Sequence, residues 1–436
     1  SLADQAGVGV EFTGSSASQL TNAGTITAAS GFAAVSFEGE GTVANSGTIN
    51  GEVRIGGPSA SFTNASGGVV NSSIGGVTLS ADGATLVNHG SITSGSANVG
   101  VTLTGANSTV TNTGAITSAG STGIRVAGPS TLDNLGGRIR GEGSYGIAFD
   151  IIGSAGTATN SGTVFGRAVG VMGPSSVLTL TNQAGGAIEG GATGLLLKAG
   201  TITNSGTITG GTTGALFRNS EGESLTIDNR SGGVIMGTLE HGIILDNVGR
   251  STVTNQGTIS GGVRGLLMMG TSQLATVTNS GTISGGAAGL SLTSGAVTNT
   301  GTITSQTGIA VDITGSTASQ LTNSGTITPA SGSAAIRMGS GNDTVTLQTG
   351  SAVNGNVDGG AGTDTLNVQA GVTFSHSYLN FEALNIEAGQ SGPSSSGEPA
   401  APVELPDIPG VTAVTVSSGS LDLSGGTVNS DVTVGI

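Results

Sequence analysis

Apolar and polar residues alternate in short runs along most of the chain. In one recurring run a small residue precedes an apolar, a variable and an apolar residue, as in G-V-E-F at residues 9–12 and G-I-R-V at residues 123–126. A period of two, rich in β-branched residues, is typical of a short strand with one face inward. A second run centres on Asn204, with Ile202 two positions before it and Ile208 four positions after it. Together the two runs predict three short strands in each repeat.

The asparagine of the second run divides the chain into repeats. Its copies are separated by 19 to 26 residues, about 23 on average. They are Asn22, Asn45, Asn64, Asn88, Asn112, Asn134, Asn160, Asn182, Asn204, Asn229, Asn255, Asn279, Asn299 and Asn323. Repeats of this size are typical of a solenoid, in which each unit buries its apolar face only against its neighbours. We therefore predict an all-β fold, a parallel β-helix with about 23 residues and three short strands per coil, which the crossover rule makes right-handed.

Each of these asparagines begins a predicted turn, most often with the sequence Asn-Ser-Gly or Asn-Thr-Gly. Glycine permits the positive φ that a sharp corner needs, and asparagine tolerates unusual backbone angles. Two interpretations remain open. The side chains either stack in a ladder in which each bonds the next, or each only caps its own turn. Both make the asparagines structural rather than catalytic.

The composition excludes several classes of protein. The chain has 436 residues with 35% hydrophobic residues, enough to fold, although 82 residues are Gly and only 3% are aromatic. A net charge of -15 argues against nucleic-acid and anionic-membrane partners, which require clustered Lys and Arg. The absence of Cys excludes disulfides and thiolate chemistry. No run of about 18 apolar residues predicts a transmembrane helix. Because the chain starts without Met or a signal segment, we expect a mature or trimmed piece of a longer product.

Two acidic turns follow the regular repeats. They are G-S-G-N-D-T-V at residues 339–345 and G-G-A-G-T-D-T-L at residues 359–366, and the second matches the calcium-binding nonapeptide. Glycines let backbone carbonyls converge, and the carboxylates of Asp343 and Asp364 supply the hard oxygen ligands that Ca²⁺ prefers. The two aspartates are 21 residues apart, about one coil. Either they bind Ca²⁺ or they form tight turns; no other cofactor is expected.

These changes of pattern suggest four segments. Residues 1–337 form the repetitive β-helix, and residues 338–389 continue it with the acidic turns. Residues 390–410 contain five prolines, which cannot donate to a ladder, and are predicted to be a linker or loop. Residues 411–436 alternate again and are predicted to add a terminal β segment.

The T-N-S-G-T-I repeats, the two acidic turns and N-F-E-A-L-N-I at residues 380–386 resemble the passenger regions of bacterial autotransporter proteins over about residues 1–390. The resemblance implies secretion through an outer membrane by a C-terminal β-barrel, and display of a β-helical stalk. The sequence to Ile436 does not include the series of amphipathic strands that such a barrel needs. We therefore expect either an excised passenger or an independent secreted protein.

From the resemblance we expect a surface-displayed stalk with an adhesion or scaffold role and no catalysis, on the extracellular side of a bacterial outer membrane. Its partners would be surface molecules of a host or neighbouring cell, or further copies of itself. A self-assembling filament or surface-layer subunit is one alternative. A polysaccharide-degrading enzyme is another, because many β-helices cleave polysaccharides with charged residues on an outward face.

Charged residues recur at one outward position of the predicted second strand. They are Asp150, Lys198, Arg218, Asp246 and Asp312. Glycoside hydrolysis needs two carboxylates about 5 to 9 Å apart, and no two acids occupy this position in neighbouring coils. The three histidines, His89, His241 and His376, are scattered and predict no metal site. The column of charged residues is therefore either a solvated surface or part of an active site.

An outward apolar stripe is the sharper surface prediction. At the variable position of the same strand, five consecutive repeats carry apolar residues, where other repeats carry small, polar or charged ones. They are Met172, Leu196, Leu216, Ile244 and Leu267. Exposed apolar stripes mark contact surfaces or are covered by the protein's own loops. We predict a binding face made of this stripe with Lys198, Arg218 and Asp246, or a stripe covered by the insertion at residues 218–225.

Overall fold

The computed structural model describes residues 2–3, 7–14, 17–95, 97–150, 155–218, 223–246, 250–270, 275–369, 372, 376–387, 403–404, 413–418, 421–422 and 431–434. Every regular element in these ranges is a strand. Within them, no helix is long and apolar enough to cross a membrane. The chain forms two compact units. The first contains residues 1–219 and 232–238, and the second contains residues 220–231 and 239–436.

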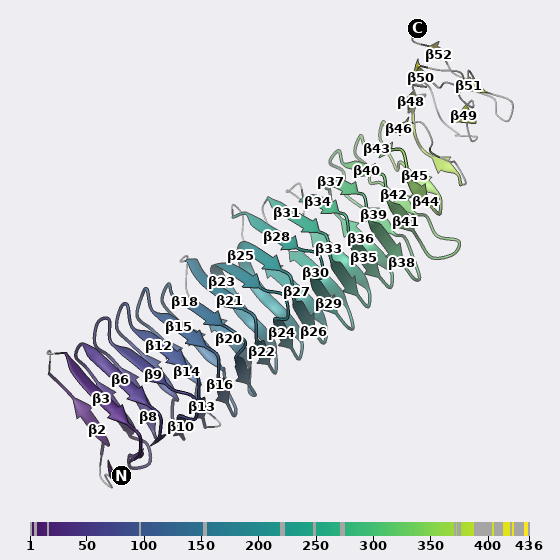
Figure 1. Cartoon of the computed structure of the whole chain (residues 1–436). Helices are drawn as coiled ribbons and strands as arrows, with labels where there is room; N and C mark the ends of the chain where they lie inside the picture. Colours follow the sequence, from purple (N-terminus) through teal and green to yellow (C-terminus); the bar gives the residue numbers. More distant parts are fainter. Residues whose placement is uncertain are drawn as a thin grey trace, which may run out of the picture. The chain divides into compact units, whose positions relative to one another are not determined.

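The first unit is a stack of coils with three strands each (Figure 1). Its first column of strands consists of β1 (Leu2–Ala3), β4 (Thr25–Thr27), β7 (Thr48–Asn50), β10 (Val69–Ser72), β13 (Ser91–Ser94), β16 (Ala115–Ser118), β19 (Arg138–Gly141), β22 (Thr163–Gly166), β24 (Ala187–Gly190), β26 (Thr207–Gly210) and β29 (Val234–Gly237). The second column consists of β2 (Val10–Phe12), β5 (Ala33–Phe37), β8 (Glu52–Ile55), β11 (Val77–Leu79), β14 (Val101–Leu103), β17 (Ile124–Val126), β20 (Tyr145–Phe149), the first parts of β23 (Val169–Asn182) and β25 (Thr193–Asn204), and β27 (Thr213–Arg218). The third column consists of β3 (Ser18–Asn22), β6 (Gly41–Asn45), β9 (Ser61–Asn64), β12 (Thr85–Asn88), β15 (Thr109–Asn112), β18 (Thr131–Asn134), β21 (Ala155–Asn160) and the second parts of β23 and β25.

The second unit repeats this three-strand coil. Its first column consists of β32 (Thr258–Gly261), β35 (Thr282–Gly285), β38 (Thr302–Ser305), β41 (Thr326–Thr328) and β44 (Ala352–Val353). The second column consists of β30 (His241–Asp246), β33 (Arg264–Met269), β36 (Ala288–Leu292), β39 (Val311–Ile313), β42 (Ile336–Arg337), β45 (Val357–Asp358) and β47 (Tyr378–Leu379). The third column consists of β28 (Leu225–Asn229), β31 (Ser251–Asn255), β34 (Ala275–Asn279), β37 (Gly295–Asn299), β40 (Gln320–Asn323), β43 (Thr344–Leu347), β46 (Thr365–Gln369), β48 (Ala383–Glu387), β50 (Ala413–Ser418) and β52 (Asp431–Val434). A separate pair joins β49 (Val403–Glu404) to β51 (Leu421–Asp422).

Strands of one column pair in parallel, and equivalent residues of successive repeats lie side by side. For example, Asn88 of β12 lies opposite Asn112 of β15, and Ile92 of β13 lies opposite Ile116 of β16. The paired strands are about 4.8 Å apart. This register confirms the predicted parallel β-helix and its three short strands per coil.

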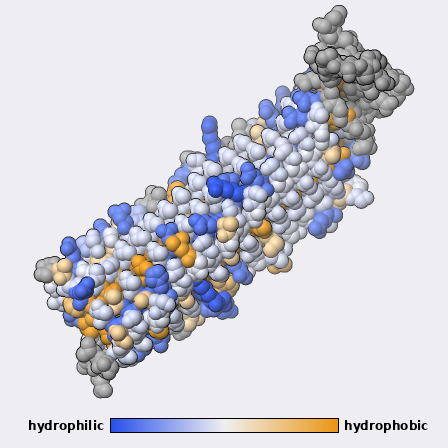
Figure 2. Space-filling model, viewed as in Figure 1, coloured by the Kyte–Doolittle hydropathy of each residue, from blue (hydrophilic) through white to orange (hydrophobic). Residues whose placement is uncertain are grey.

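The core of each unit is the line of inward side chains. In β25, Leu195, Leu197 and Ile202 are fully buried, whereas Leu196 and Lys198 point outward and are half-buried. The alternation is the one that the sequence predicts for a strand with one face inward. On the face seen in Figure 2, most atoms of both units are pale, and the orange apolar atoms lie in separate groups. The apolar residues are thus used mainly inside the coils.

The β-helix continues past residue 337, because β43 pairs with β46 and β46 pairs with β48. In the predicted terminal segment, β50 pairs in parallel with β48, and β52 with β50. Of the predicted linker at residues 390–410, only the short strand β49 belongs to the described residues. The remaining residues of that segment lie outside them.

Candidate functional site

The turn asparagines form a ladder in each unit. In the first unit, Nδ2 of each asparagine donates to Oδ1 of the next at 2.7 to 2.9 Å, from Asn22 through to Asn204. In the second unit the same bond, 2.7 Å long, links Asn229, Asn255, Asn279, Asn299 and Asn323. All of these side chains are buried. The sequence left two interpretations open, and the first, a ladder, is present in both units.

The same amide nitrogens also cap their own turns. Nδ2 of Asn112 donates to the carbonyl oxygen of Gly114 at 3.2 Å, and Nδ2 of Asn279 donates to that of Gly281 at 3.2 Å. A carboxamide carries both a donor and an acceptor, so a column of them can bond head to tail while satisfying buried carbonyl groups. Both predicted roles are therefore filled by one side chain.

The apolar stripe is divided between the two units. Met172, Leu196 and Leu216 lie opposite one another in the first unit. Ile244 and Leu267 lie opposite one another in the second. Four of the five side chains are half-buried, but Ile244 is only 9% exposed. Side chains of coils about 4.8 Å apart shield one another, so an outward position in a stack is less exposed than the same position on a single strand.

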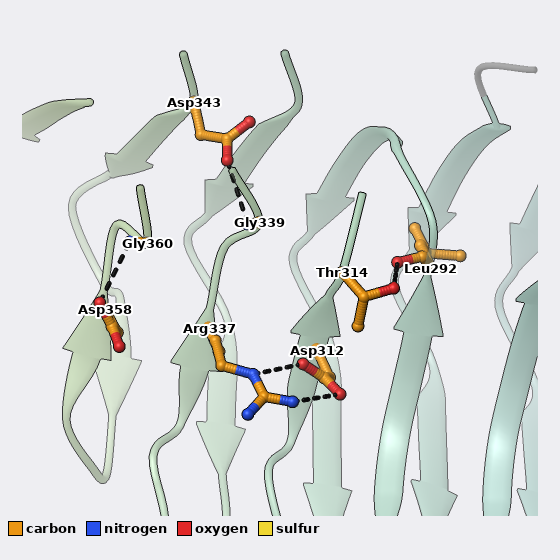
Figure 3. Close-up of polar contacts among 8 residues, drawn as sticks. All are labelled: Leu292, Asp312, Thr314, Arg337, Gly339, Asp343, Asp358 and Gly360. Carbon is orange, nitrogen blue, oxygen red and sulfur yellow. Dashed lines mark hydrogen bonds and ion pairs between the residues drawn. The ribbon is translucent and has the colours of Figure 1, made fainter. Parts of the chain in front are cut away.

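Two of the predicted outward charged residues, Asp150 and Asp312, form ion pairs between neighbouring coils. Nε of Arg125 donates to Oδ2 of Asp150 at 2.5 Å. Figure 3 shows Arg337 extending across to Asp312 in the preceding coil, with hydrogen bonds of 2.8 and 2.9 Å. Exposed pairs of this type contribute about 0 to 1 kcal/mol to stability. Asp150 and Asp312 thus have structural partners. The prediction that Asp312 belongs to the charged column is wrong, because Asp312 lies opposite Ser291, and Ser291 lies opposite Leu267 at the central outward position.

Of the other members of the charged column, Arg218 and Asp246 end their strands, and Lys198 lies within β25. Lys198 and Arg218 directly follow Leu197 and Phe217, which lie opposite each other in β25 and β27 of the first unit. Asp246 ends β30 of the second unit, opposite Met269. Within the described ranges, no group of three or more His, Asp or Glu side chains could hold a metal ion. The described side chains of this column show no pair of acids.

His241 lies at the start of β30, whereas Asp246 of the charged column lies at the end of the same strand. Its Nδ1 atom is buried and makes no hydrogen bond, and it lies opposite Arg264 of β33. Burial, and then the charge of Arg264, lowers the pKa of His241. The charge of the neighbouring Glu240 raises this pKa, but by less than burial and Arg264 lower it, so the imidazole is less basic than usual.

A second charged cluster lies on the first column of the first unit, where the sequence pattern did not predict one. The guanidinium of Arg140 lies 4.1 Å from the centre of the Phe165 ring and forms an ion pair with Glu142. The hydrogen bond from Arg140 lowers the pKa of Glu142, and the charges of Arg138 and Arg167 lower it further. Arg138 and Arg140 lie on β19, and Glu142 and Arg167 directly follow β19 and β22, whereas the predicted charged residues lie on, or directly after, strands of the second column.

The acidic turns place their carboxylates on main-chain amides. Oδ1 of Asp343 accepts from the Ser319 amide at 2.7 Å, and Oδ2 accepts from the Gly339 amide at 3.1 Å (Figure 3). Oδ1 of Asp364 accepts from the Asp343 amide at 2.7 Å. Asp343 and Asp364 are 1% and 0% exposed, respectively. These are the predicted tight turns, in which a carboxylate ties one coil to the next.

The predicted calcium site would use the same carboxylates as these hydrogen bonds. Calcium takes six to eight oxygen ligands at about 2.3 to 2.6 Å, whereas both oxygens of Asp343 already accept hydrogen bonds from amides. One oxygen of Asp364, Oδ2, is buried without a hydrogen-bond partner. Calcium binding stays a prediction that a binding measurement has to test.

Comparison with protein-family models, characterised proteins and solved structures finds no match to this chain. The resemblance to autotransporter passengers therefore depends on the quoted sequence motifs.

Proposed function

We propose that the chain is part of an extracellular β-helical scaffold that serves as a stalk, without catalysis. The asparagine ladders carry this proposal, because they use one buried polar residue in each coil to hold the neighbouring coil. Eight such bonds follow one another in the first unit and four in the second. A scaffold needs coils that resist separation, and the repeated bond supplies this from Asn22 to Asn204 and from Asn229 to Asn323.

The proposal includes display or secretion outside a bacterial cell. Its support is the resemblance of the T-N-S-G-T-I repeats and the N-F-E-A-L-N-I segment to autotransporter passengers. A chain without cysteine and with a net charge of -15 suits this setting, because it depends on no redox compartment and stays soluble through charge repulsion.

The contact surface of the proposed scaffold is the apolar stripe. Met172, Leu196 and Leu216 follow one another in adjacent coils, and Lys198 and Arg218 lie two residues after Leu196 and Leu216 on the same strands. Apolar side chains bordered by charged ones are the usual composition of a protein contact surface. Its partner would be a molecule of another cell surface or a second copy of the chain.

Three measurements on the purified whole chain test the proposal. Small-angle scattering asks whether the two units continue one stack, which a scaffold requires. Beads coated with the chain should adhere to cells or to one another, and the Leu216→Asp variant should adhere less. Incubation with acidic and neutral polysaccharides should release no shorter fragments. A particle with no extended dimension, or polysaccharide cleavage that is lost on substitution of an outward charged residue, would contradict the proposal.

A further inference from the structure

The outward face of the third strand column in the first unit carries two straight rows rich in threonine, which we call the threonine face. One row lies three residues before each ladder asparagine, and the other lies directly before it. All of these side chains are exposed or half-buried. The first row is Gln19, Thr42, Ser61, Thr85, Thr109, Thr131, Thr157, Thr179 and Thr201, and the second is Thr21, Ala44, Thr63, Val87, Thr111, Asp133, Thr159, Thr181 and Thr203.

The two rows form a regular lattice. Equivalent threonines of neighbouring coils lie opposite one another, as Thr157, Thr179 and Thr201 do, so they repeat at about 4.8 Å along the stack. The two threonines of one strand are two residues apart and are therefore separated by about 6.6 Å. Threonine is branched at Cβ, which restricts its χ1 angle. The hydroxyl and methyl groups are thus held at regular positions.

The asparagine ladder keeps the spacing of this lattice uniform. Each ladder asparagine directly follows a residue of the second row, and its hydrogen bond to the next coil is 2.7 to 2.9 Å long throughout the first unit. Side-chain ladders of this kind stabilise flat sheets, which would otherwise twist.

Strand propensity alone does not account for the threonine face. Threonine suits any solvent-facing strand position, yet the other two columns of the same unit carry mixed residues at equivalent outward positions. These are Asn71, Thr93, Thr117, Arg140, Phe165, Glu189, Thr209 and Met236 in one row of the first column, and Glu11, Ser36, Arg54, Thr78, Thr102, Arg125, Ala148 and Met172 in one row of the second.

The second unit repeats the arrangement beside its own asparagine ladder. Directly before the asparagines, four successive coils carry threonine, and two of these coils carry a second threonine two residues earlier. The residues are Thr254, Thr278, Thr298 and Thr322 in the one row, with Thr252 and Thr276 in the other. The combination of ladder and threonine rows is therefore present in both units.

The chemistry of the threonine face favours a neutral partner that forms hydrogen bonds. In the first unit its rows contain one charged residue, Asp133, and no aromatic residue, although the chain has a net charge of -15. Charge complementarity therefore favours neither a polyanion nor a polycation. No hydrogen bond joins the hydroxyl groups of Thr159, Thr181 or Thr203 to another described residue, so these groups are available to water.

We propose that the threonine face binds the surface of ice crystals. Regularly spaced hydroxyl groups hold water molecules by hydrogen bonds, and the adjacent methyl groups order the water around them. Water molecules on the faces of ice also repeat in two directions, at spacings similar to those of the threonine lattice. A partner that itself repeats can contact every coil in the same way, which a single soluble molecule cannot. This activity goes beyond the scaffold function and does not use the apolar stripe.

Ice is the probe that tests the proposal. When a dilute solution of the whole chain freezes slowly onto a cooled ice surface, the chain should enter the ice, whereas a protein without affinity for ice stays in the liquid. Thr181→Tyr places a large ring within the threonine face without changing the charge, and it should remove most of this uptake. Thr102→Tyr is the matched control, because Thr102 is a half-buried outward residue of the second column. It should enter the ice as wild type does, and circular dichroism checks that both variants fold.

Two results would overturn the proposal: exclusion of the wild-type chain from ice, and equal loss of uptake in Thr181→Tyr and Thr102→Tyr. If Thr181→Tyr fails to fold, Thr159→Ser combined with Thr181→Ser serves instead, because it keeps both hydroxyl groups, removes both methyl groups and should reduce uptake. Exclusion from ice together with binding to insoluble cellulose that Thr181→Tyr abolishes would assign the face to a crystalline polysaccharide. The adhesion test of the scaffold function uses Leu216 on another column, so the two proposals can fail separately.

Discussion

Asparagine and aspartate side chains both link neighbouring coils in this protein, but they do so with different hydrogen bonds. An asparagine side chain has both a donor and an acceptor, so a column of them bonds head to tail, as between Asn160 and Asn182. An aspartate has only acceptors when charged, so Asp343 and Asp364 bond main-chain amides instead of each other. An asparagine column can therefore extend through many coils. A column of charged acids, by contrast, accumulates repulsion with each added coil.

The ladder leads to a first residue-scale prediction. Asn182→Ala removes the acceptor of Asn160 Nδ2 and the donor to Asn204 Oδ1, and all three side chains are buried. Leaving buried polar atoms unsatisfied costs about 1 to 3 kcal/mol. Amide exchange of peptides around residue 182 should therefore accelerate by about 5- to 150-fold, as the same free energy implies.

An exposed rung provides the control for this prediction. Nδ2 of Asn385 donates to Oδ1 of Asn367 at 2.9 Å on the exposed face of the second unit. Water can replace this bond, so Asn385→Ala should change local stability by less than about 0.5 kcal/mol. Equal effects of the two substitutions would show that burial of the ladder contributes nothing to its strength.

At the scale of the element, the start of the second strand in many coils requires glycine. In many coils a glycine precedes the inward apolar residue, and its Cα lies against the carbonyl group of the next coil. A Cβ atom on Gly146 would lie 2.7 Å from the Gly170 oxygen, and one on Gly194 would lie 2.5 Å from the Gly214 oxygen. The small residue of the repeated run is therefore required by the spacing of the coils, and not by a special backbone angle.

Gly194→Ala should therefore destabilise the first unit. The added methyl group would also lie 2.8 Å from the Thr209 oxygen and 2.9 Å from Cγ2 of Ile208, so the backbone has to shift. Overpacking of this kind costs about 1 to 3 kcal/mol. Gly24→Ala is the matched control, because a methyl group on Gly24 would have no neighbouring atom within 4 Å. Thermal unfolding followed by circular dichroism should show a lower midpoint for Gly194→Ala alone.

The sequence predicts the elements better than it predicts the surface. Strand positions follow from local alternation, and the register follows from the recurrence of asparagine, since each repeat lies beside its own copy. Exposure is different, because it depends on neighbouring coils. Ile244 is predicted to be exposed but is 9% exposed, and Phe165 packs on Arg140 of the preceding coil. To predict contacts between coils, the alignment of two repeats of unequal length has to be known. The residue pattern of a single strand does not provide that alignment.

At the scale of the molecule, stability is a sum of coils and of the contacts between neighbouring coils. A substitution in one coil therefore changes the stability of that coil and its neighbours, and leaves distant coils unchanged. The net charge, in contrast, acts on the whole molecule, because copies of a chain with a net charge of -15 repel one another. Self-association through an apolar stripe then has to overcome this repulsion, which salt screens over about 10 Å at 0.1 M.

The stripe prediction can be tested with two positions of the same strand column. Leu216 and Thr102 both occupy the outward central position of their strands, β27 and β14, and both are half-buried. If the stripe drives self-association, sedimentation should show assembly that strengthens with added salt, and Leu216→Asp should weaken it at least about tenfold, or about 1.4 kcal/mol. Thr102→Asp adds the same charge outside the stripe and should weaken assembly much less. Equal weakening by both variants would mean that net charge, and not the apolar stripe, controls the assembly of this protein.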